Sequence, residues 1–279
     1  MNSTSKNFGP HEPIDFWLPF AIVFSINFLY FIFCQCVKDN SWIDVFWGLI
    51  FIEPIVGTLI VQLIRGQQIP IRSYLILGLV TLWALRLALH IGLRHKGEDF
   101  RYQDMRKRWS EGGSCEYYSK TIGYIFMMQG LFSLVANAAC LYTVILTPNT
   151  ALRWNDYLGV GVWFIGFAIE VAADLQLRAH LKDTTPGKGK FCKRGLWKYS
   201  RHPNYFGEAV LWWGPYIICC SVYFGWTMVF APLFIGYLVR FLSGVPMLEA
   251  KYEGNPEFKH YCRETNVFAL WCNKTVNEE

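Results

Sequence analysis

Residues 17–33 read WLPFAIVFSINFLYFIF, a run without a single charged side chain. A helix needs about 20 mostly apolar residues to cross the hydrocarbon core of a bilayer. The run follows a polar segment, residues 1–16, which holds two prolines and lacks the basic start of a signal peptide. We therefore expect the run to stay in the protein as a membrane-spanning helix.

Six further stretches are apolar enough for the same role. The 279 residues are 53% hydrophobic, and the 12 Trp, 22 Phe and 15 Tyr exceed the usual content of a soluble domain. Aromatic girdles at two membrane interfaces explain this excess. The sequence therefore predicts an all-α, polytopic membrane bundle of about seven transmembrane helices. The expected spans are residues 17–33, 42–64, 73–93, 121–146, 156–177, 205–224 and 225–241.

Basic residues are divided unequally between the loops that these spans would leave. Most Lys and Arg fall on one side, and the opposite side carries Lys6, Arg65, Arg72 and Arg153. The positive-inside rule then predicts a lumenal or external N-terminus and a cytosolic C-terminus. We expect one membrane domain, residues 17–272, followed by a polar tail at 273–279.

The composition argues against several other classes of protein. The net charge of +5 is mild and concentrated in a few loops, and no acidic or basic tail is present, so no nucleic-acid partner is expected. Nine cysteines are scattered along the chain, and none has C-x-x-C spacing with a histidine partner. They are predicted to be small buried hydrophobes, which favours neither a disulfide framework nor a metal site.

Seven of the ionisable residues that lie within or at the ends of the expected spans are singled out here, because a charge there is costly unless it faces a bundle interior or a wet cavity. Structural ion pairs with snorkelling side chains are one interpretation. A polar pocket that opens to the cytosol is the other, and we favour it because the residues come from four or five different spans. They are Asp44, Glu53, Arg86, Glu170, Asp174, Glu208 and Arg240.

The segment 195–208, GLWKYSRHPNYFGE, carries the side chains that such a pocket needs to bind a nucleotide. Its cations match phosphate, its tyrosines can stack on a ring, and its amide and carboxyl groups can bond hydroxyls. Neither a G-x-G-x-x-G nor a P-loop motif is present. His202 in the same loop is ambiguous, since a packed histidine is the commoner case. The other candidates, in that order, are Lys198 and Arg201, Tyr199 and Tyr205, and Asn204 and Glu208.

This segment resembles the steroid 5α-reductase superfamily, and within it the DUF1295 branch. Several other motifs occur in the matching order, so the resemblance extends from about residue 40 to 272. They are SWIDVFWG at 41–48, KGEDFRYQDMR at 96–106, Glu170 with Asp174 and Gln176, WWG at 212–214 and SGVPMLEAKY at 243–252.

The resemblance implies a seven-helix membrane reductase that binds NADPH in a cavity facing the cytosol. It implies that hydride reaches a carbon–carbon double bond conjugated to a carbonyl in a lipid or steroid-like substrate. The C-terminal half, about residues 155–272, would hold the cofactor. Residues at the family's dinucleotide contacts are Asp174, Arg178, Tyr199, Asn204, Glu208 and Arg240, with Arg201 and His202 in the same loop.

Such a reduction needs an acid that donates to the carbonyl oxygen as charge develops there. Steroid reductases use a Glu on the second span with a Tyr on the third. Glu53 matches the acid, and with Arg86 it is our expected catalytic pair; a structural role for Glu53 beside Pro54 stays open. Trp83 stands where the Tyr is expected, and an indole N–H donates a hydrogen bond without acting as an acid.

Two other functions fit parts of the sequence. RHPNYFGE also resembles the RHP-x-Y-x-G loop of isoprenylcysteine and phospholipid methyltransferases, which use S-adenosylmethionine. Alternatively, the chain is a non-catalytic structural subunit that contacts other proteins of a membrane complex and keeps a nucleotide pocket. A reductase is expected in the endoplasmic reticulum, and such a subunit in the mitochondrial inner membrane. The methyltransferase C-terminal signature is faintly matched by Glu249, Tyr252, Glu253, Phe258 and Tyr261.

Overall fold

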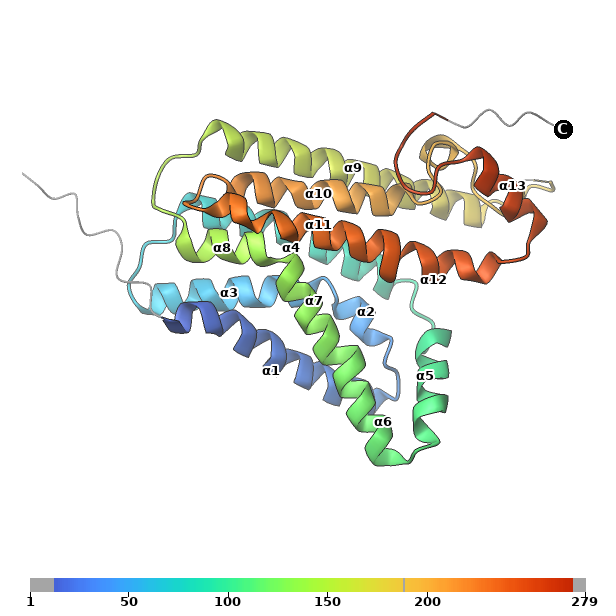
Figure 1. Ribbon diagram of the computed structural model, residues 1–279, viewed down its shortest axis with the longest axis horizontal. Coiled ribbons are helices and arrows are strands. Elements are labelled where there is room, and N and C mark those ends of the chain that lie inside the picture. The colour runs from blue at the N-terminus through green and yellow to red at the C-terminus, as the bar shows by residue number, and fades with distance from the viewer. Residues whose placement is uncertain (1–12, 188, 273–279) are drawn as a thin grey trace, which may run out of the picture. The chain divides into compact units, whose positions relative to one another are not determined.

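A computed structural model describes residues 13–187 and 189–272, and over these residues the regular structure is helical. The chain divides into two compact units (Figure 1). Unit 1 contains the described residues up to Arg153 together with Cys219–Met228. Unit 2 contains Trp154–Ile218 and the described residues from Val229 onward. The predicted segment 1–16 lies largely, and the tail 273–279 wholly, outside the described residues.

Unit 1 is built on three long helices that pack in chain order. α1 lies along α3, α3 lies along α4, and the short α2 packs on α4. The bounds are α1 (Pro13–Val37), α2 (Trp42–Phe46), α3 (Leu49–Ile64), α4 (Ile71–Gly92), α5 (Phe100–Ser110), α6 (Ser114–Lys120), the π-helix η1 (Thr121–Met127), α7 (Met128–Ala136) and α8 (Ala138–Leu146).

The expected span 42–64 is divided between α2 and α3 at Gly48. A Cβ atom at Gly48 would lie 2.7 Å from the carbonyl oxygen of Ala84 on α4. Glycine therefore lets the junction of the two helices rest directly on the neighbouring backbone.

The expected span 121–146 is bent. The helices Ser114–Ala136 and Ala138–Leu146 meet at 59°, with Asn137 between them. The Asn137 side chain donates a hydrogen bond of 2.9 Å to the carbonyl oxygen of Phe51 on α3. This bond ties the break between the two helices to α3.

Unit 2 consists of two long helices, a loop between them and a C-terminal run of shorter helices. The bounds are α9 (Trp154–Lys182), the 3-10 helix η2 (Gly195–Lys198), α10 (Pro203–Cys219), η3 (Gly225–Val229), α11 (Phe230–Tyr237), the π-helix η4 (Leu238–Leu242), α12 (Val245–Glu249), η5 (Ala250–Tyr252) and α13 (Pro256–Glu264). The last residue of α10 and most of η3 fall in unit 1.

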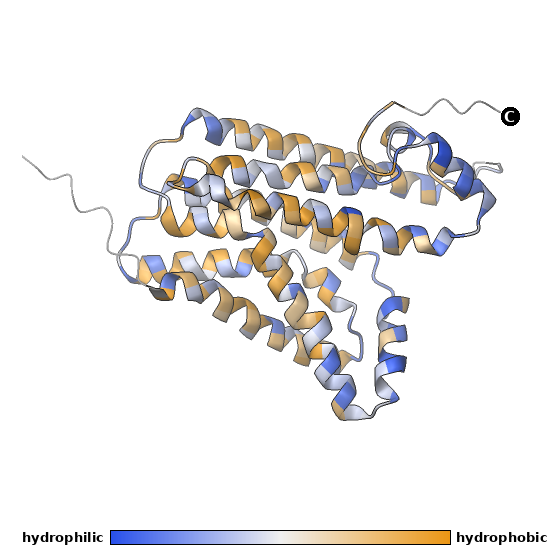
Figure 2. Ribbon diagram, in the orientation of Figure 1, coloured by the Kyte–Doolittle hydropathy of each residue, from blue (hydrophilic) through white to orange (hydrophobic). Residues whose placement is uncertain are grey.

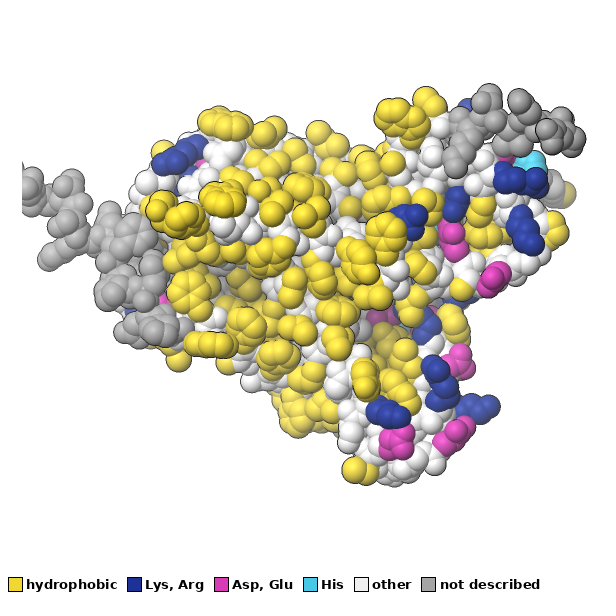
Figure 3. All heavy atoms as spheres, viewed as in Figure 1, with side chains coloured by type: hydrophobic (Ala, Val, Ile, Leu, Met, Phe, Trp, Pro, Cys, Tyr) yellow, Lys and Arg dark blue, Asp and Glu magenta, His cyan; other side chains and the backbone are white. Residues whose placement is uncertain are grey.

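The long helices expose apolar side chains around much of their circumference. Figure 2 shows α1 and α11 hydrophobic over most of their length, whereas α5 and α13 are largely hydrophilic. On the visible face in Figure 3, charged side chains gather near α5 and α6 in unit 1 and near α12 and α13 in unit 2. Exposed residues on α1 include Trp17, Leu29 and Phe28, which are 66%, 60% and 47% accessible. Surfaces of this kind are suited to lipid.

Within residues 13–187 and 189–272, four helices are long and apolar enough to cross a membrane, or five if the bent pair is one span. The prediction of an all-α polytopic membrane bundle is confirmed. The count of seven and the orientation of the termini stay predictions. α3 and α10, with 16 and 17 residues, are shorter than the usual span.

Candidate functional site

The candidate site in unit 2 begins with an unusually close contact between α9 and α10. A Cβ at Gly166 of α9 would lie 2.3 Å from the Leu211 nitrogen and 2.6 Å from the Gly207 oxygen on α10. Nearer the start of α9, Gly159 approaches Gly214 of α10 in the same way. Small residues that let two backbones touch are the usual basis of helix packing in membranes.

This packing places polar side chains of the two helices side by side. The Asn204 amide of α10 donates a hydrogen bond of 3.1 Å to Asp174 of α9. Asp174, Glu170 and Glu208 are 8%, 3% and 7% accessible. Among the described residues, the Asn204 side-chain oxygen is buried and has no hydrogen-bond partner. A buried acceptor without a donor costs free energy, so it marks a place for a ligand or water donor.

The loop before α10 is anchored to α9 by its backbone and its aromatic ring. The Trp197 indole donates 2.9 Å to the carbonyl oxygen of Ala173. The Gln176 side chain accepts 2.9 Å from the backbone nitrogen of Leu196. Gly195 has a positive φ of 59°, and a Cβ there would lie 2.4 Å from the same Gln176 side chain. The loop is thereby fixed beside the Asp174–Asn204 pair.

Arg201 is engaged by protein groups. Its guanidinium bonds both carboxylate oxygens of Glu249, at 2.9 and 3.2 Å, and donates to the carbonyl oxygens of Cys262 and Thr265. His202 bonds the same carboxylate at 2.9 Å, and its ring stacks on Tyr205. The arrangement, which we call the Arg201 clamp, joins the loop to α12 and α13.

The residues after α12 pack against the loop before α10. The Tyr261 hydroxyl donates 2.6 Å to the carbonyl oxygen of Trp197, and burial raises the pKa of this tyrosine. The Ser200 hydroxyl donates 2.6 Å to the carbonyl oxygen of Phe268. Ser200 and Asn266 form an isolated parallel β-bridge. Residues far apart in sequence thus form one compact end of unit 2.

Other predicted cofactor residues lie on the surface of this unit. Arg178, Lys198 and Tyr199 are exposed, and the Lys198 ammonium lies 5.9 Å from the Tyr199 ring centroid. Arg240 is half-buried in η4, with its guanidinium 4.6 Å from the Phe241 ring centroid. The exposed cations are available to an anion, whereas Arg201 already has a carboxylate.

Two open cavities lie at this end of unit 2. One of about 580 Å³ is lined by Glu249, Tyr252, Phe258, Lys259, Cys262 and Arg263. The other, about 500 Å³, is lined by Arg201, Cys262, Thr265 and the residues that follow. Both volumes are in the range of small-molecule sites. Of the predicted cofactor residues, Arg201 lines the second cavity.

The predicted catalytic residues Glu53 and Arg86 belong to unit 1. Arg86 is half-buried on α4. Glu53 accepts a hydrogen bond from the hydroxyl of Tyr30 on α1, and its second oxygen is buried without a partner among the described residues. Trp83 is fully buried and packs edge-on against Phe51, with ring centroids 5.2 Å apart. Sequence reasoning missed Tyr30, because one tyrosine in an apolar run carries no distinctive signal.

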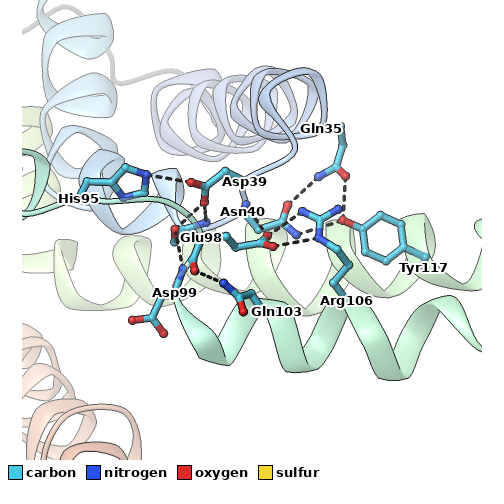
Figure 4. A network of polar contacts seen from close by, with 10 residues as sticks. Gln35, Asp39, Asn40, His95, Glu98, Asp99, Gln103, Arg106 and Tyr117 are labelled. Carbon is cyan, nitrogen blue, oxygen red and sulfur yellow. Dashed lines mark hydrogen bonds and ion pairs between the residues drawn. The ribbon is translucent and has the colours of Figure 1, made fainter.

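A second polar cluster in unit 1 is built from the KGEDFRYQDMR segment (Figure 4). Glu98 accepts from the Arg106 guanidinium at 2.6 and 3.0 Å and from the Asn40 backbone nitrogen at 2.9 Å. The bond to Glu98 raises the pKa of Arg106. Asp39 bonds His95 at 2.8 Å. These contacts, with those of Gln35, Asp99, Gln103 and Tyr117, tie the end of α1 to α5 and α6.

Asp44 belongs to another group of hydrogen-bonded side chains in unit 1. It accepts 2.8 Å from the guanidinium of Arg101 and 2.6 Å from the hydroxyl of Tyr102. Burial alone would lower the pKa of Arg101, but the carboxylates of Asp44 and Asp99 outweigh burial and raise it. Asp44 thus has its charge balanced within the protein, as the ion-pair interpretation expects.

Comparisons with known proteins agree with the motifs. A protein of Schizosaccharomyces pombe, "Uncharacterized protein C594.04c", is 26% identical over 220 residues, which cover 68% of this chain and 61% of that protein. The chain thus spans about three fifths of the length of this relative. No solved structure matches the chain. The model of the family "Protein of unknown function (DUF1295)" matches residues 30–265, and the chain belongs to this family.

Proposed function

We propose that the protein is a membrane-embedded reductase that uses NADPH to reduce a conjugated carbon–carbon double bond in a lipid or steroid-like substrate. The observation that carries the proposal is the buried, unpartnered oxygen of Asn204 beside Asp174, within a unit whose nearby cations are exposed. A dinucleotide has hydroxyl and amide groups that can donate to the Asn204 oxygen, and it has phosphates that can bind the exposed cations.

The side chains present fit such a cofactor. The Asn204 oxygen and the Asp174 carboxylate can accept from ribose hydroxyls or the carboxamide, and both are held by the α9–α10 contact. Arg178 and Lys198 can meet phosphate, and Tyr199 can stack on a ring. Arg201 and His202 act indirectly, since their bonds to Glu249 hold the loop in place.

Bound NADPH would supply the hydride. The protein's own contribution is to orient the two reactants and to provide a proton at the carbonyl oxygen. Glu53 is the proposed acid. Arg86 is proposed to stabilise the negative charge that develops on the carbonyl oxygen. A membrane domain suits a lipid substrate, and the endoplasmic reticulum membrane is the proposed location.

Titration of the purified protein with NADPH in mild detergent tests the proposal. We expect saturable binding that weakens at least tenfold in Asn204→Ala and in Arg178→Ala, because each removes about 1.5 kcal/mol of hydrogen bonding or charge. Lys107→Ala, an exposed cation on α5 of unit 1, is the control and should bind as the wild type does. Equal affinity in all four proteins would overturn the assignment of the site.

One observation favours a methyltransferase as the second candidate. The Arg201 clamp joins the RHPNYFGE loop to Glu249, the two regions that resemble the isoprenylcysteine and phospholipid methyltransferases. Under this alternative the same unit would hold S-adenosylmethionine. Titration with S-adenosylmethionine in parallel with NADPH separates the two functions.

A further inference from the structure

Tyr30 and Glu53 form a pair inside unit 1 that no sequence motif indicates. The Tyr30 hydroxyl, on α1, donates its hydrogen bond to Oε1 of Glu53 on α3. The Tyr30 ring is itself held by stacking on Phe46 of α2, with centroids 4.2 Å apart and an interplanar angle of 16°. Three helices therefore fix the hydroxyl in position.

The two oxygens of Glu53 are not equivalent. Oε1 accepts the tyrosine proton, whereas Oε2 is buried and has no partner among the described residues. A carboxyl group that carries a proton has one accepting carbonyl oxygen and one donating hydroxyl. Because Oε1 is occupied as an acceptor, the proton of the acid belongs on Oε2.

We propose that Tyr30 is a positioning residue that directs the acidic proton of Glu53 to Oε2, toward the carbonyl oxygen of the substrate. This inference rests on the proposed function, in which Glu53 is the acid. An ionised carboxylate with a buried, unpartnered oxygen in an apolar helix would be costly, so Glu53 carries its proton at rest. The bond between Oε2 and hydrogen breaks as a bond between hydrogen and the enolate oxygen forms, and the electron pair stays on Oε2.

The resulting carboxylate is stabilised by the same tyrosine. Once Oε2 has lost its proton, the Tyr30 hydroxyl donates to a charged acceptor, and hydrogen bonds to charged groups are about twice as strong as neutral ones. Tyr30 thus assists the transfer without giving up its own proton.

Infrared spectroscopy of this chain in detergent tests the proposed position of the Glu53 proton without knowledge of the substrate. The carbonyl stretching band of protonated Glu53 is defined as the band lost in Glu53→Gln. In Tyr30→Phe that band should move to higher wavenumber, because the carbonyl oxygen loses its hydrogen-bond donor. Tyr142→Phe is the matched control, since that hydroxyl donates 2.8 Å to the Tyr223 carbonyl in the same unit, and the band should stay in place.

Tyr30→Phe keeps the aromatic ring and its stacking on Phe46, and a monodisperse elution profile checks that it folds. If it fails to fold, the wild type containing fluorotyrosine replaces it. The more acidic hydroxyl should move the Glu53 band to lower wavenumber. An absent Glu53 band in the wild type, or a band that neither change moves, would overturn the inference. Since NADPH is not present in this experiment, its outcome is independent of the titration that tests the proposed function.

Discussion

Arg201 and Arg178 lie in the same unit with opposite surroundings, and these surroundings determine what each substitution does. The Arg201 side chain is 10% accessible and bonds Glu249, which is 22% accessible. Arg178 is exposed at the end of α9. An arginine that is paired and largely buried holds structure, whereas an exposed one is available to a ligand.

Arg201→Ala is therefore expected to destabilise unit 2. Removal of one partner leaves the Glu249 carboxylate short of its charge partner, at a cost on the order of 3 kcal/mol in the free energy of unfolding. Thermal unfolding in detergent measures the loss. Arg178→Ala serves as the control, and its stability should stay within about 0.5 kcal/mol of the wild type. Equal stability of the two variants would show that the clamp contributes nothing.

Arg201 also shows what sequence reasoning can and cannot reach. The residue type and its loop predict an anion partner, and the structure supplies an anion from the protein itself, Glu249, 48 residues later. Local spacing carries no information about such a distant pairing. The family resemblance, in contrast, selects both Asp174 and Asn204, and these two residues meet in the structure.

At the scale of single elements, the α9–α10 contact depends on glycine. Gly166→Ala should push α10 away from α9, because the new Cβ would lie 2.3 Å from the Leu211 backbone nitrogen. Overpacking of this kind costs about 1–3 kcal/mol, and it should also weaken NADPH binding by displacing Asn204. Gly161→Ala on the same helix meets no atom within 4 Å and is the matched control. Equal melting temperatures of Gly166→Ala and Gly161→Ala would contradict a close backbone contact between α9 and α10 at Gly166.

α13 is docked through the hydroxyl of Tyr261, and this docking should depend on pH. Burial raises the pKa of Tyr261, so the folded protein holds this proton more tightly than the unfolded chain, where tyrosine titrates near pH 10. The stabilisation is therefore complete below about pH 10 and decreases above it. Tyr261→Phe should lose about 1 kcal/mol at neutral pH.

Melting temperatures of the wild type and Tyr261→Phe between pH 8 and 11 test this dependence. The difference between the two proteins should be constant up to about pH 10 and shrink at higher pH. A difference that is constant over the whole range would place Tyr261 in contact with water.

The sequence predicts the helical class well, because long apolar runs allow little else in a membrane. The sequence predicts the boundaries of the helices less well. The break at Gly48 and the bend at Asn137 both lie at contacts with other helices, α4 and α3 respectively. The sequence does not predict that Tyr30 bonds Glu53, because nothing distinguishes Tyr30 from the other aromatic residues of its apolar run.

For the whole molecule, the charge distribution predicts which loops face the cytosol. Cys115, exposed in the first turn of α6, should react with a membrane-impermeant maleimide from the cytosolic side. A cysteine introduced at Asn149, in the loop after α8, should react from the opposite side of sealed membranes. Labelling of both positions from the same side would refute the predicted topology.

Mass spectrometry of small molecules released from protein purified in mild detergent tests whether the molecule holds NADPH. We expect NADPH or NADP in the wild type and less of it in Asn204→Ala. S-adenosylmethionine or its demethylated product would contradict the claim in favour of a methyltransferase. An empty protein that elutes with other subunits at fixed stoichiometry would contradict it in favour of a structural role.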